Sequence, residues 1–163
     1  VLLFRRNGHW HLPLIQRPTY PGVHSGQMAF PGGQYEKQDA DLVETALRET
    51  HEEIGVVVER QQVVGQLSDL YIPPSNNLVT PVLAITNQLP AYQPDPLEVA
   101  KVVEAPLPVL QDTANQRPVK LELETGIKVQ VPSYQVEGHT VWGATAMMLS
   151  ELLEILAELG IED

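Results

Sequence analysis

The clearest pattern of apolar and polar positions lies between residues 39 and 55. At about 100° per residue, this stretch places three aliphatic side chains on one side of a helix and three acids within an arc of roughly 100° on the other side. The aliphatic residues are Val43, Leu47 and Ile54, and the acids are Glu49, Glu52 and Glu53. The pattern therefore predicts an amphipathic helix, with Asp39 as its N-cap and Gly55 at its C-terminal end.

Shorter runs rich in aliphatic and β-branched residues flank this helix and predict strands. These strands are expected at residues 1–6, 11–17, 63–70, 78–86 and 98–104, with a hairpin turn at Asn7-Gly8. Residues 121–131 predict a further hairpin, 134–142 an extended piece, and 143–159 a second amphipathic helix. The expected buried face of that helix consists of Met147, Met148, Leu152, Ile155 and Leu156. Together these elements favour an α/β fold with one sheet covered on two faces, in a single domain that spans residues 1–163.

The composition narrows the classes of protein. The chain has 163 residues, of which 43% are hydrophobic and 19% charged, and this is sufficient for one domain with a buried core. Its net charge of −11, from 10 basic and 21 acidic residues, argues against a basic nucleic-acid-binding surface. No apolar run approaches the roughly 20 residues of a membrane span. The absence of cysteine excludes disulfides and thiolate metal sites and fits a cytoplasmic protein. Residues 1–4 are expected to belong to a strand whose start has been trimmed.

The three acids crowd the C-terminal end of the predicted helix. Like charges repel one another, and the helix macrodipole is negative at this end, so the cluster is costly unless a cation neutralises it. Hard divalent cations prefer carboxylate oxygens, and Mg²⁺ is usually bound through a few carboxylates and substrate phosphates. We therefore interpret the cluster as a metal site, the alternative being an exposed acidic helix end. Through such an ion, an acidic protein can still bind an anionic ligand.

The residues around this helix resemble the Nudix box, G-x(5)-E-x(7)-R-E-U-x-E-E-x-G-U. Gly33 corresponds to its first glycine, and residues 48–55 read R-E-T-H-E-E-I-G. Segments 24–33, 95–99, 106–107 and 142–146 are similar to the coenzyme A pyrophosphatases of that family, so the resemblance covers most of the chain. Gly33 and Arg48 are fifteen steps apart instead of fourteen, a longer spacing that this subgroup shares. The first acid of the box therefore falls at Asp39 when counted from Gly33, or at Ala40 when counted back from Arg48. Gly22 stands where the subgroup has an arginine.

The resemblance implies a Nudix-like α/β/α sandwich with a central mixed sheet. It implies metal-dependent hydrolysis, with Mg²⁺ or Mn²⁺, of a phosphoanhydride in a nucleoside diphosphate linked to another moiety. Coenzyme A or its derivatives are the favoured substrates, with 3′,5′-ADP and 4′-phosphopantetheine as the products. The alternatives are hydrolysis of ADP-ribose or another nucleoside diphosphate derivative, and a nucleotide-binding Nudix domain without turnover. Each of these partners is a small nucleotide, and neither nucleic acid nor membrane is expected.

The resemblance also implies roles for individual residues. Glu49 and Glu53 would be the primary metal ligands, Glu52 would complete a second metal site, and a main-chain carbonyl of Gly32-Gly33 would contribute. Arg48 would orient a glutamate through a salt bridge. The remaining two candidates lie outside the box: Glu98, as a further metal ligand or a general base in competition with Glu49, and Arg17, as a phosphate contact. A solvated loop glutamate and a surface salt bridge are the respective alternatives for these two, and the C-terminal helix is either core or the surface of a homodimer.

Overall fold

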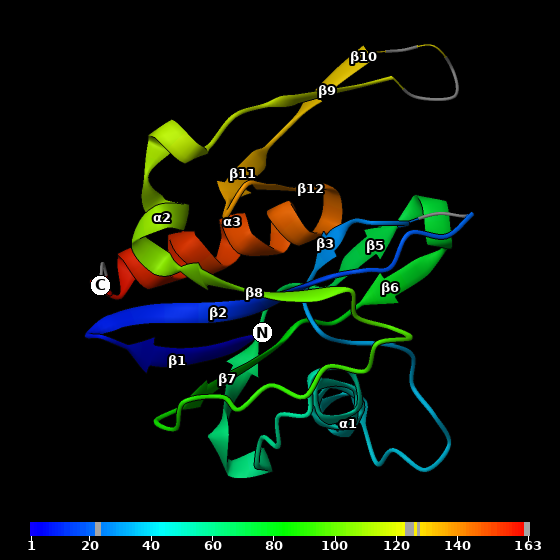
Figure 1. Cartoon of the computed structure of the whole chain (residues 1–163), viewed down its shortest axis with the longest axis vertical. Coiled ribbons are helices and arrows are strands. Elements are labelled where there is room, and N and C mark those ends of the chain that lie inside the picture. The colour runs from blue at the N-terminus through cyan, green and yellow to red at the C-terminus, as the bar shows by residue number, and fades with distance from the viewer. Residues whose placement is uncertain (22–23, 123–125, 127, 162–163) are drawn as a thin grey trace.

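A mixed six-stranded sheet forms the centre of the structure, a computed structural model that describes residues 1–21, 24–122, 126 and 128–161 (Figure 1). The strands are β1 (Leu2–Arg6), β2 (His9–Gln16), β3 (Met28–Ala29), β4 (Val63–Gln66), β7 (Val82–Thr86) and β8 (Lys101–Pro106). β2 pairs antiparallel with β1, β3 and β8, whereas β1 and β7 run parallel and β4 pairs antiparallel with β7. The mixed sheet expected from the family resemblance is therefore confirmed.

Helices cover both faces of this sheet (Figure 1). α1 (Leu42–Ile54) lies on one face, and α2 (Leu107–Gln111) and α3 (Gly143–Glu158) lie on the other. Successive side chains of a strand point to opposite faces, so Leu2 packs in the cluster that contains Ile54 of α1, while Leu3 packs in the cluster that contains Leu149 of α3. The result is the predicted sandwich of two helical layers around one sheet.

Three two-stranded hairpins lie outside the central sheet. They are formed by β5 (Leu70–Ile72) with β6 (Asn77–Val79), β9 (Val119–Glu122) with β10 (Lys128–Val131), and β11 (Ser133–Val136) with β12 (His139–Trp142). Short 3-10 turns occur at Pro73–Ser75, Arg60–Gln62 and Thr113–Asn115. The β9–β10 arm projects away from the body of the molecule, and most of its turn lies outside the described residues (Figure 1).

Several predicted boundaries were wrong. The single strand expected at 63–70 is divided into β4 and β5, and that expected at 78–86 into β6 and β7, which are separated by Pro81. Proline has no N–H to donate to a sheet, and the carbonyl of Pro81 instead accepts the N–H of Leu67 at 2.9 Å. The extended piece expected at 134–142 is a hairpin that turns at Glu137 and Gly138, both of which have positive φ angles.

The ends of α1 correct one further prediction. Asp41, not Asp39, is the N-cap, and its side chain accepts the N–H of Glu44 at 2.9 Å. At the other end, Gly55 has φ 71°, as predicted for a C-terminal glycine. A Cβ atom there would lie 2.6 Å from the Cβ of Gln93, so this position requires glycine for both its backbone angle and its close contact.

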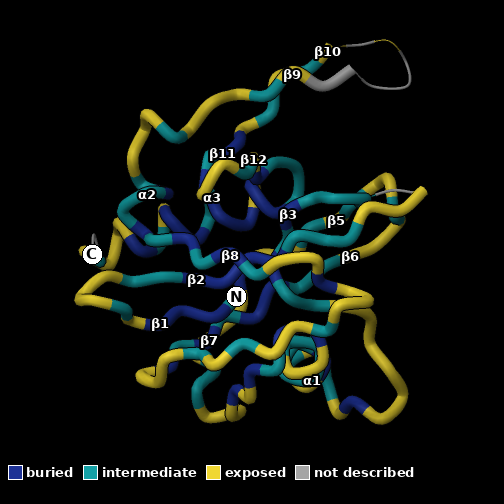
Figure 2. The backbone as a smooth tube through the Cα atoms, in the orientation of Figure 1, coloured by how far each residue is buried: buried dark blue, intermediate teal, exposed yellow. Residues whose placement is uncertain are grey.

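Figure 2 shows that buried residues follow the central strands and the inner side of α3. Met148, Leu152 and Leu156 are buried as predicted, and Ile155 is partly buried. The prediction for Met147 was wrong, because this side chain is 52% exposed. Among the described residues, no helix has both the length and the apolar character that a membrane span requires.

Candidate active site

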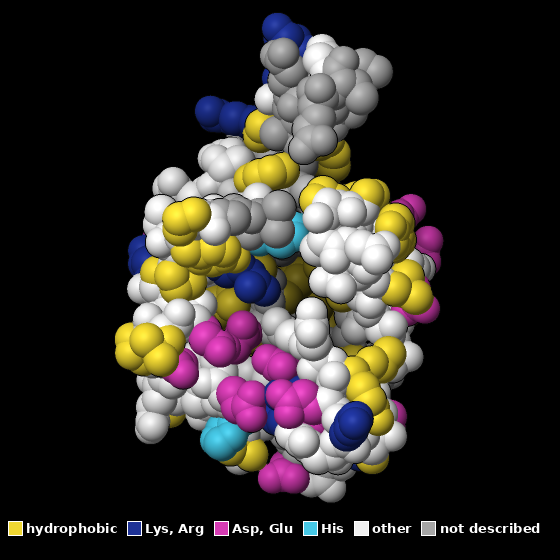
Figure 3. Space-filling view, turned by 90° about the vertical axis from the view of Figure 1, so that its right-hand side faces the viewer, with side chains coloured by type: hydrophobic (Ala, Val, Ile, Leu, Met, Phe, Trp, Pro, Cys, Tyr) yellow, Lys and Arg dark blue, Asp and Glu magenta, His cyan; other side chains and the backbone are white. Residues whose placement is uncertain are grey.

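A cleft of about 1140 Å³ is lined by residues from α1, the Gly32-Gly33 loop, the β5–β6 hairpin and the first turns of α3. Acidic side chains gather below the hollow that Figure 3 shows on this side of the molecule. Glu49, Glu53 and Glu98 are the acids of the lining, and Arg17 and His24 carry its basic groups among the described residues. The cleft therefore brings together four charged residues of the predicted site: the acids Glu49, Glu53 and Glu98 and the basic residue Arg17.

Glu53 is the most buried acid of α1. Glu53 is only 4% exposed to solvent, and one of its carboxylate oxygens accepts the backbone N–H of Gly32 at 2.8 Å. Burial raises the pKa of this carboxyl to about 7, because the charged form loses its hydration. The Gly32 N–H and the charge of Arg17 oppose this rise, whereas nearby Glu49 adds to it. The negative charge of Glu53 is therefore only partly compensated by the protein.

The carboxylate of Glu49 lies directly against Gly33. A Cβ atom at residue 33 would overlap that carboxylate, so glycine is required for the observed position of the acid. Arg48 donates to Glu49 Oε1 from Nη1 at 2.9 Å. Burial nevertheless raises the pKa of the Glu49 carboxyl, because desolvation outweighs the attraction of Arg48. The Gly-Gly loop thus contacts two acids: the Gly32 N–H binds Glu53, and Gly33 leaves space for Glu49.

Arg48 is the centre of a network behind the cleft. It donates to both carboxylate oxygens of Asp39, from Nε at 2.9 Å and from Nη2 at 3.0 Å, and its Nη1 donates to Glu49 and Glu52, each at 2.9 Å. Asp39 also accepts the hydroxyl of Thr45 at 2.8 Å. These partners hold the pKa of Asp39 well below its usual range. The geometry thus matches the predicted salt bridge of Arg48 to a glutamate, although its role in a reaction stays a prediction.

Asp39 is the residue whose part the sequence interpretation missed. It was predicted to be a helix cap, whereas it is buried and forms the second anchor of Arg48. The available signal was its distance from Gly33, because this distance places it where the Nudix box has its first acid. Asp39 lies before α1 begins at Leu42, and its carboxylate pairs with Arg48 inside the helix.

Glu52 differs from the other two acids of the predicted metal set. Its side chain is 54% exposed, it pairs with Arg48, and it is not among the residues that line the cleft. Within the described ranges, no group of three or more His, Asp or Glu side chains is placed to hold an ion. Glu49 and Glu53 do fit a hard divalent cation, because both are partly desolvated carboxylates on one wall of the cleft. The predicted set of three ligands stays a prediction.

Glu98 reaches the same cleft from a loop that is anchored on the end of α1. The N–H of Asp95 in this loop donates to the carbonyl of Glu53 at 3.0 Å. The carbonyl of Asp95 in turn accepts the N–H groups of Glu98 at 3.1 Å and Val99 at 2.8 Å, which closes a tight turn. Glu98 is exposed in this turn, and its charge contributes to the raised pKa of both Glu49 and Glu53.

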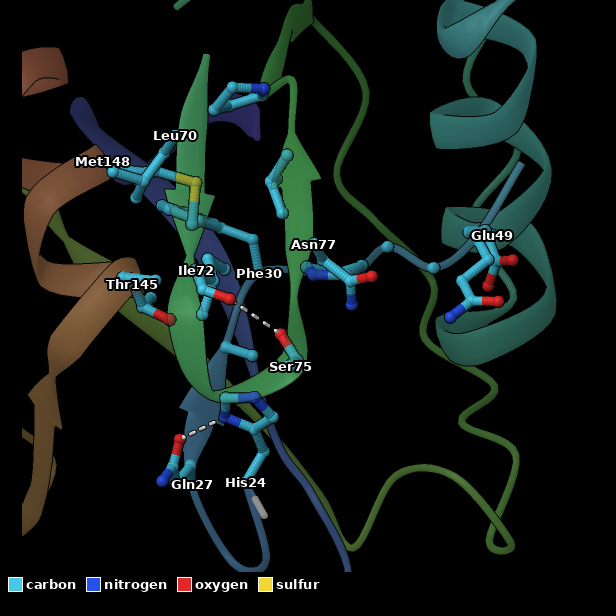
Figure 4. Close-up of a pocket in the computed structure, with 18 of the residues that line it drawn as sticks. His24, Gln27, Phe30, Glu49, Leu70, Ile72, Ser75, Asn77, Thr145 and Met148 are labelled. Carbon is cyan, nitrogen blue, oxygen red and sulfur yellow. Dashed lines mark hydrogen bonds between the residues drawn. The ribbon is translucent and has the colours of Figure 1, made fainter. Parts of the chain in front are cut away.

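The basic residues of the cleft, Arg17 and His24, come from the end of β2 and the turn that follows it. Arg17 is half-buried, and its backbone N–H donates to the carbonyl of Gln27 at 3.0 Å. His24 Nδ1 lies 3.1 Å from the side-chain oxygen of Gln27. Figure 4 marks this contact with a dashed line. Gly22, the departure from the subgroup pattern, lies outside the described residues. The predicted phosphate contact Arg17 is thus positioned on the cleft, close enough to lower the pKa of Glu53.

Comparison with known proteins identifies the family. Residues 1–117 match the NUDIX domain family. The chain belongs to the Nudix family. It is 37% identical over 138 residues to mitochondrial coenzyme A diphosphatase NUDT8 of Homo sapiens, in a match that covers 83% of this chain and 58% of that protein. It is 33% identical over 143 residues to the uncharacterized Nudix hydrolase NudL of Photorhabdus laumondii, covering 88% and 75% of the two chains.

Solved structures agree with this Nudix assignment at the level of the fold. The MutT/nudix family protein from Enterococcus faecalis superposes with a TM-score of 0.66 at 20% identity, covering 96% of this chain and 60% of that one. The NUDIX domain of Shewanella oneidensis NrtR, solved with ADP ribose, gives a TM-score of 0.52 at 24% identity, covering 65% and 68%. The α/β Nudix sandwich is therefore confirmed. The match to the human relative spans less than two thirds of that protein's length.

Proposed function

We propose that this Nudix chain is a divalent-cation-dependent hydrolase of a phosphoanhydride in a nucleoside diphosphate linked to another moiety. The observation that carries the proposal is the gathering of Glu49, Glu53 and Glu98 with Arg17 on one cleft. Burial raises the pKa values of Glu49 and Glu53, and acids perturbed in this way in a cleft are typical of functional sites. The costly acid cluster also disfavours the alternative of a nucleotide-binding domain without turnover, since such a domain gains nothing from partly uncompensated carboxylates.

The reaction adds the oxygen of water to one phosphorus atom of the anhydride. The bond from that phosphorus to the bridging oxygen breaks, the other phosphate leaves with the electron pair, and the water proton passes to a base. The base is Glu98 or Glu49, since both carboxylates lie on the cleft. Arg17 would bind a phosphate oxygen, and Arg48 would hold Glu49 in place through the 2.9 Å contact.

The residues present fit Mg²⁺ or Mn²⁺ as the cofactor. Glu49 and Glu53 would hold the ion, with Glu52 and a main-chain carbonyl of Gly32-Gly33 as the further predicted ligands. When bound, the ion supplies charge neutralisation of the diphosphate and acidification of water. Its charge would also stabilise the ionised form of Glu53, which the protein alone leaves partly uncompensated.

Coenzyme A or one of its derivatives is the proposed substrate, with 3′,5′-ADP and 4′-phosphopantetheine as the products. Two findings support this choice. The segments 24–33 and 95–99 resemble the coenzyme A pyrophosphatases, and a human relative with 37% identity carries the name coenzyme A diphosphatase. ADP-ribose and other nucleoside diphosphate derivatives are the alternative substrates.

A hydrolysis assay with four classes of compound distinguishes coenzyme A from the alternative substrates. Purified protein with Mg²⁺ or Mn²⁺ is tested against coenzyme A, ADP-ribose, dinucleoside polyphosphates and nucleoside triphosphates, with phosphate counted after phosphatase treatment. We expect turnover of coenzyme A that is lost in Glu53→Gln and retained in Glu154→Gln, an exposed acid of α3 outside the cleft. Turnover of ADP-ribose alone would refute coenzyme A as the substrate. Absence of turnover with all four classes would refute the proposed hydrolase activity.

Three further properties remain proposals. We expect one folded domain across residues 1–163, a cytoplasmic location, and an oligomeric state that is either monomer or homodimer. A single cooperative unfolding transition and the mass in solution by light scattering would test the first and the third. Fractionation of cells that contain the full-length protein would test the second.

A further inference from the structure

The segment that carries Glu98 connects β7 to β8 and contains neither helix nor strand between residues 87 and 100. Figure 1 shows this segment running past α1 before it enters β8. Ordering such a segment costs conformational entropy at every residue, so contacts along it must hold Glu98 at the cleft. The part after Glu98 is fixed to the sheet, since the N–H of Ala100 donates to the carbonyl of Gln16 at 2.9 Å.

The part before Glu98 lies on the C-terminal end of α1. The N–H of Gln93 donates to the carbonyl of Ile54 at 2.8 Å, and the N–H of Asp95 donates to that of Glu53 at 3.0 Å. Gln93 also lies so close to Gly55 that any Cβ atom at residue 55 would overlap it. The residues that hold this part in place therefore decide where Glu98 lies relative to the acids of α1.

Tyr92 is the side chain that fixes this part of the segment from the other side. It directly precedes Gln93 and is half-buried against the core cluster that contains Ile54. Next to it, Glu104 of β8 pairs with Arg6 of β1 across the intervening strand β2. Arg6 Nε lies 2.8 Å from one carboxylate oxygen, and Nη2 donates to the other at 2.9 Å. A two-point pair of this kind fixes the orientation of the carboxylate.

The Tyr92 hydroxyl is buried beside this ion pair. Burial and the charge of Glu104 raise the pKa of the phenol, burial being the larger cause. In the part of the chain that the structure describes, no hydrogen bond of standard geometry satisfies the hydroxyl. A buried hydroxyl without a partner is costly, and a carboxylate that binds one arginine still has free acceptor positions. Glu104 is therefore the acceptor available to Tyr92.

We propose that Tyr92, through donation of its hydroxyl to Glu104, is a positioning residue that holds Glu98 at the acidic part of the cleft. The inference rests on the proposed function, in which Glu98 is a candidate base. Neither Tyr92 nor Glu104 lines the cleft, so the effect must pass along the chain. Pro94 and Pro96 restrict the backbone rotations between Tyr92 and Glu98, and a displacement at one residue is therefore transmitted to the other.

The competing explanation is that Tyr92 only fills space in the core. Tyr92→Phe separates the two, because it keeps the packing of the ring and removes only the hydroxyl. Tyr134→Phe is the matched control. Tyr134 is 5% exposed, its hydroxyl lies 2.8 Å from that of Ser150, and it belongs to the core cluster on the α3 side of the sheet, outside the cleft lining.

Hydrogen exchange of the metal-free protein tests the anchor without any reaction. The reporters are the N–H groups of Asp95, Glu98 and Val99, each of which donates a hydrogen bond within the seated segment. Loss of one hydrogen bond to a charged group favours local opening by about tenfold or more, so Tyr92→Phe should speed exchange at these three groups by that factor. Glu104→Gln, which removes the charge of the acceptor, should act in the same direction, and the control should leave this exchange unchanged.

Turnover of coenzyme A with Mg²⁺ tests whether the anchor acts through Glu98. Tyr92→Phe should lower kcat by about three- to tenfold through misplacement of the carboxylate, whereas Tyr134→Phe should leave kcat unchanged. The double variant of Tyr92→Phe with Glu98→Gln should have the same kcat as Glu98→Gln alone, because a carboxylate that is absent cannot be misplaced. A purely structural role of Tyr92 would lower kcat equally in both backgrounds.

The other outcomes overturn the inference at different steps. Unchanged exchange in Tyr92→Phe, together with a higher Tm, would show that the hydroxyl has no partner in solution. Faster exchange without loss of kcat, or a loss that persists in the Glu98→Gln background, would refute the positioning role while leaving the proposed hydrolase intact. Absence of turnover in the wild type would refute the hydrolase and the role at Glu98 together, whereas the exchange rates would still decide whether Tyr92 anchors the segment.

Discussion

Replacing Glu53 by glutamine should stabilise the metal-free chain at pH 8 and leave its stability nearly unchanged at pH 4.5. The folded pKa of about 7 lies above the ordinary value of 4.5 because the side chain is buried. Between these two pH values the folded state binds more protons than the unfolded state, so the contribution of Glu53 to stability falls as the pH rises. At 1.36 kcal/mol per pH unit, the cost above pH 7 is about 3 kcal/mol.

Glutamine removes this cost and retains an oxygen that can accept the Gly32 N–H. Unfolding by urea in the presence of a chelator, at pH 4.5 and at pH 8, measures the difference in the free energy of unfolding. For a chain of this length, about 2–4 °C per kcal/mol gives a rise in Tm of about 6–12 °C at pH 8. The control Glu154→Gln, an exposed acid, should show no such pH dependence. Equal pH dependence of stability in wild type and Glu53→Gln would refute the reasoning.

The cation should remove most of this difference in stability between the wild type and Glu53→Gln. Mg²⁺ or Mn²⁺ at 100 times its Kd stabilises the folded protein by about 2.7 kcal/mol, and we expect this gain at pH 8 in the wild type. Glu53→Gln should gain much less, since it lacks one of the carboxylates proposed to hold the ion. The same increase in Tm for both proteins on addition of Mg²⁺ would exclude Glu53 as a ligand.

Three further substitutions test individual parts of the site. Glu98→Gln should lower kcat by about 10²-fold or more without changing Tm because the residue is exposed, and wild-type kcat would leave Glu49 as the base. Gly33→Ala should lower kcat/KM by about 100-fold through displacement of the Glu49 carboxylate, and unchanged kinetics would contradict the required contact. Asp39→Asn should lower Tm at pH 7 through loss of its ion pair with Arg48, and the difference should narrow as the pH falls below the ordinary Asp value of 3.8 toward the depressed folded pKa. A Tm difference that persists undiminished in acid would argue against this ion pair as its source.

Much of the fold follows from the sequence because the relevant patterns are local. The helical periodicity of residues 39–55 predicts α1 and its glycine end, and the aliphatic runs at residues 1–6 and 11–17 predict the first two strands of the sheet. Boundaries that depend on tertiary contacts were not predicted. The division of strand 78–86 had a local signal in Pro81, which has no N–H to donate to a sheet. Met147, by contrast, is exposed because the α3 position that it occupies faces the cleft instead of the core.

The candidate site was predictable in its residue types but not in the direction of its side chains. A helical projection places Glu52 and Glu53 at the two edges of one arc of about 100°, and it does not give the direction that either side chain takes. In the structure, Arg48 binds Glu52 four residues along the helix, outside the cleft, while Glu53 turns inward to the Gly32 N–H. The position of Glu98 depends on hydrogen bonds between its loop and the end of α1, which no local pattern encodes.

The distribution of positive charge explains why one part of the acid cluster requires a cation more than the rest. Arg48 pairs with Asp39, Glu49 and Glu52, so the acids behind the cleft and at its edge share a guanidinium. Within the described residues, Glu53 forms no ion pair, and Arg17 acts on it only by electrostatic attraction at longer range. A buried carboxylate without a paired charge is costly, and a lysine in contact with it would remove the attraction for a divalent ion. The arrangement therefore stabilises the helix through Arg48 while it leaves negative charge uncompensated at Glu53, the point where a metal and a diphosphate would meet.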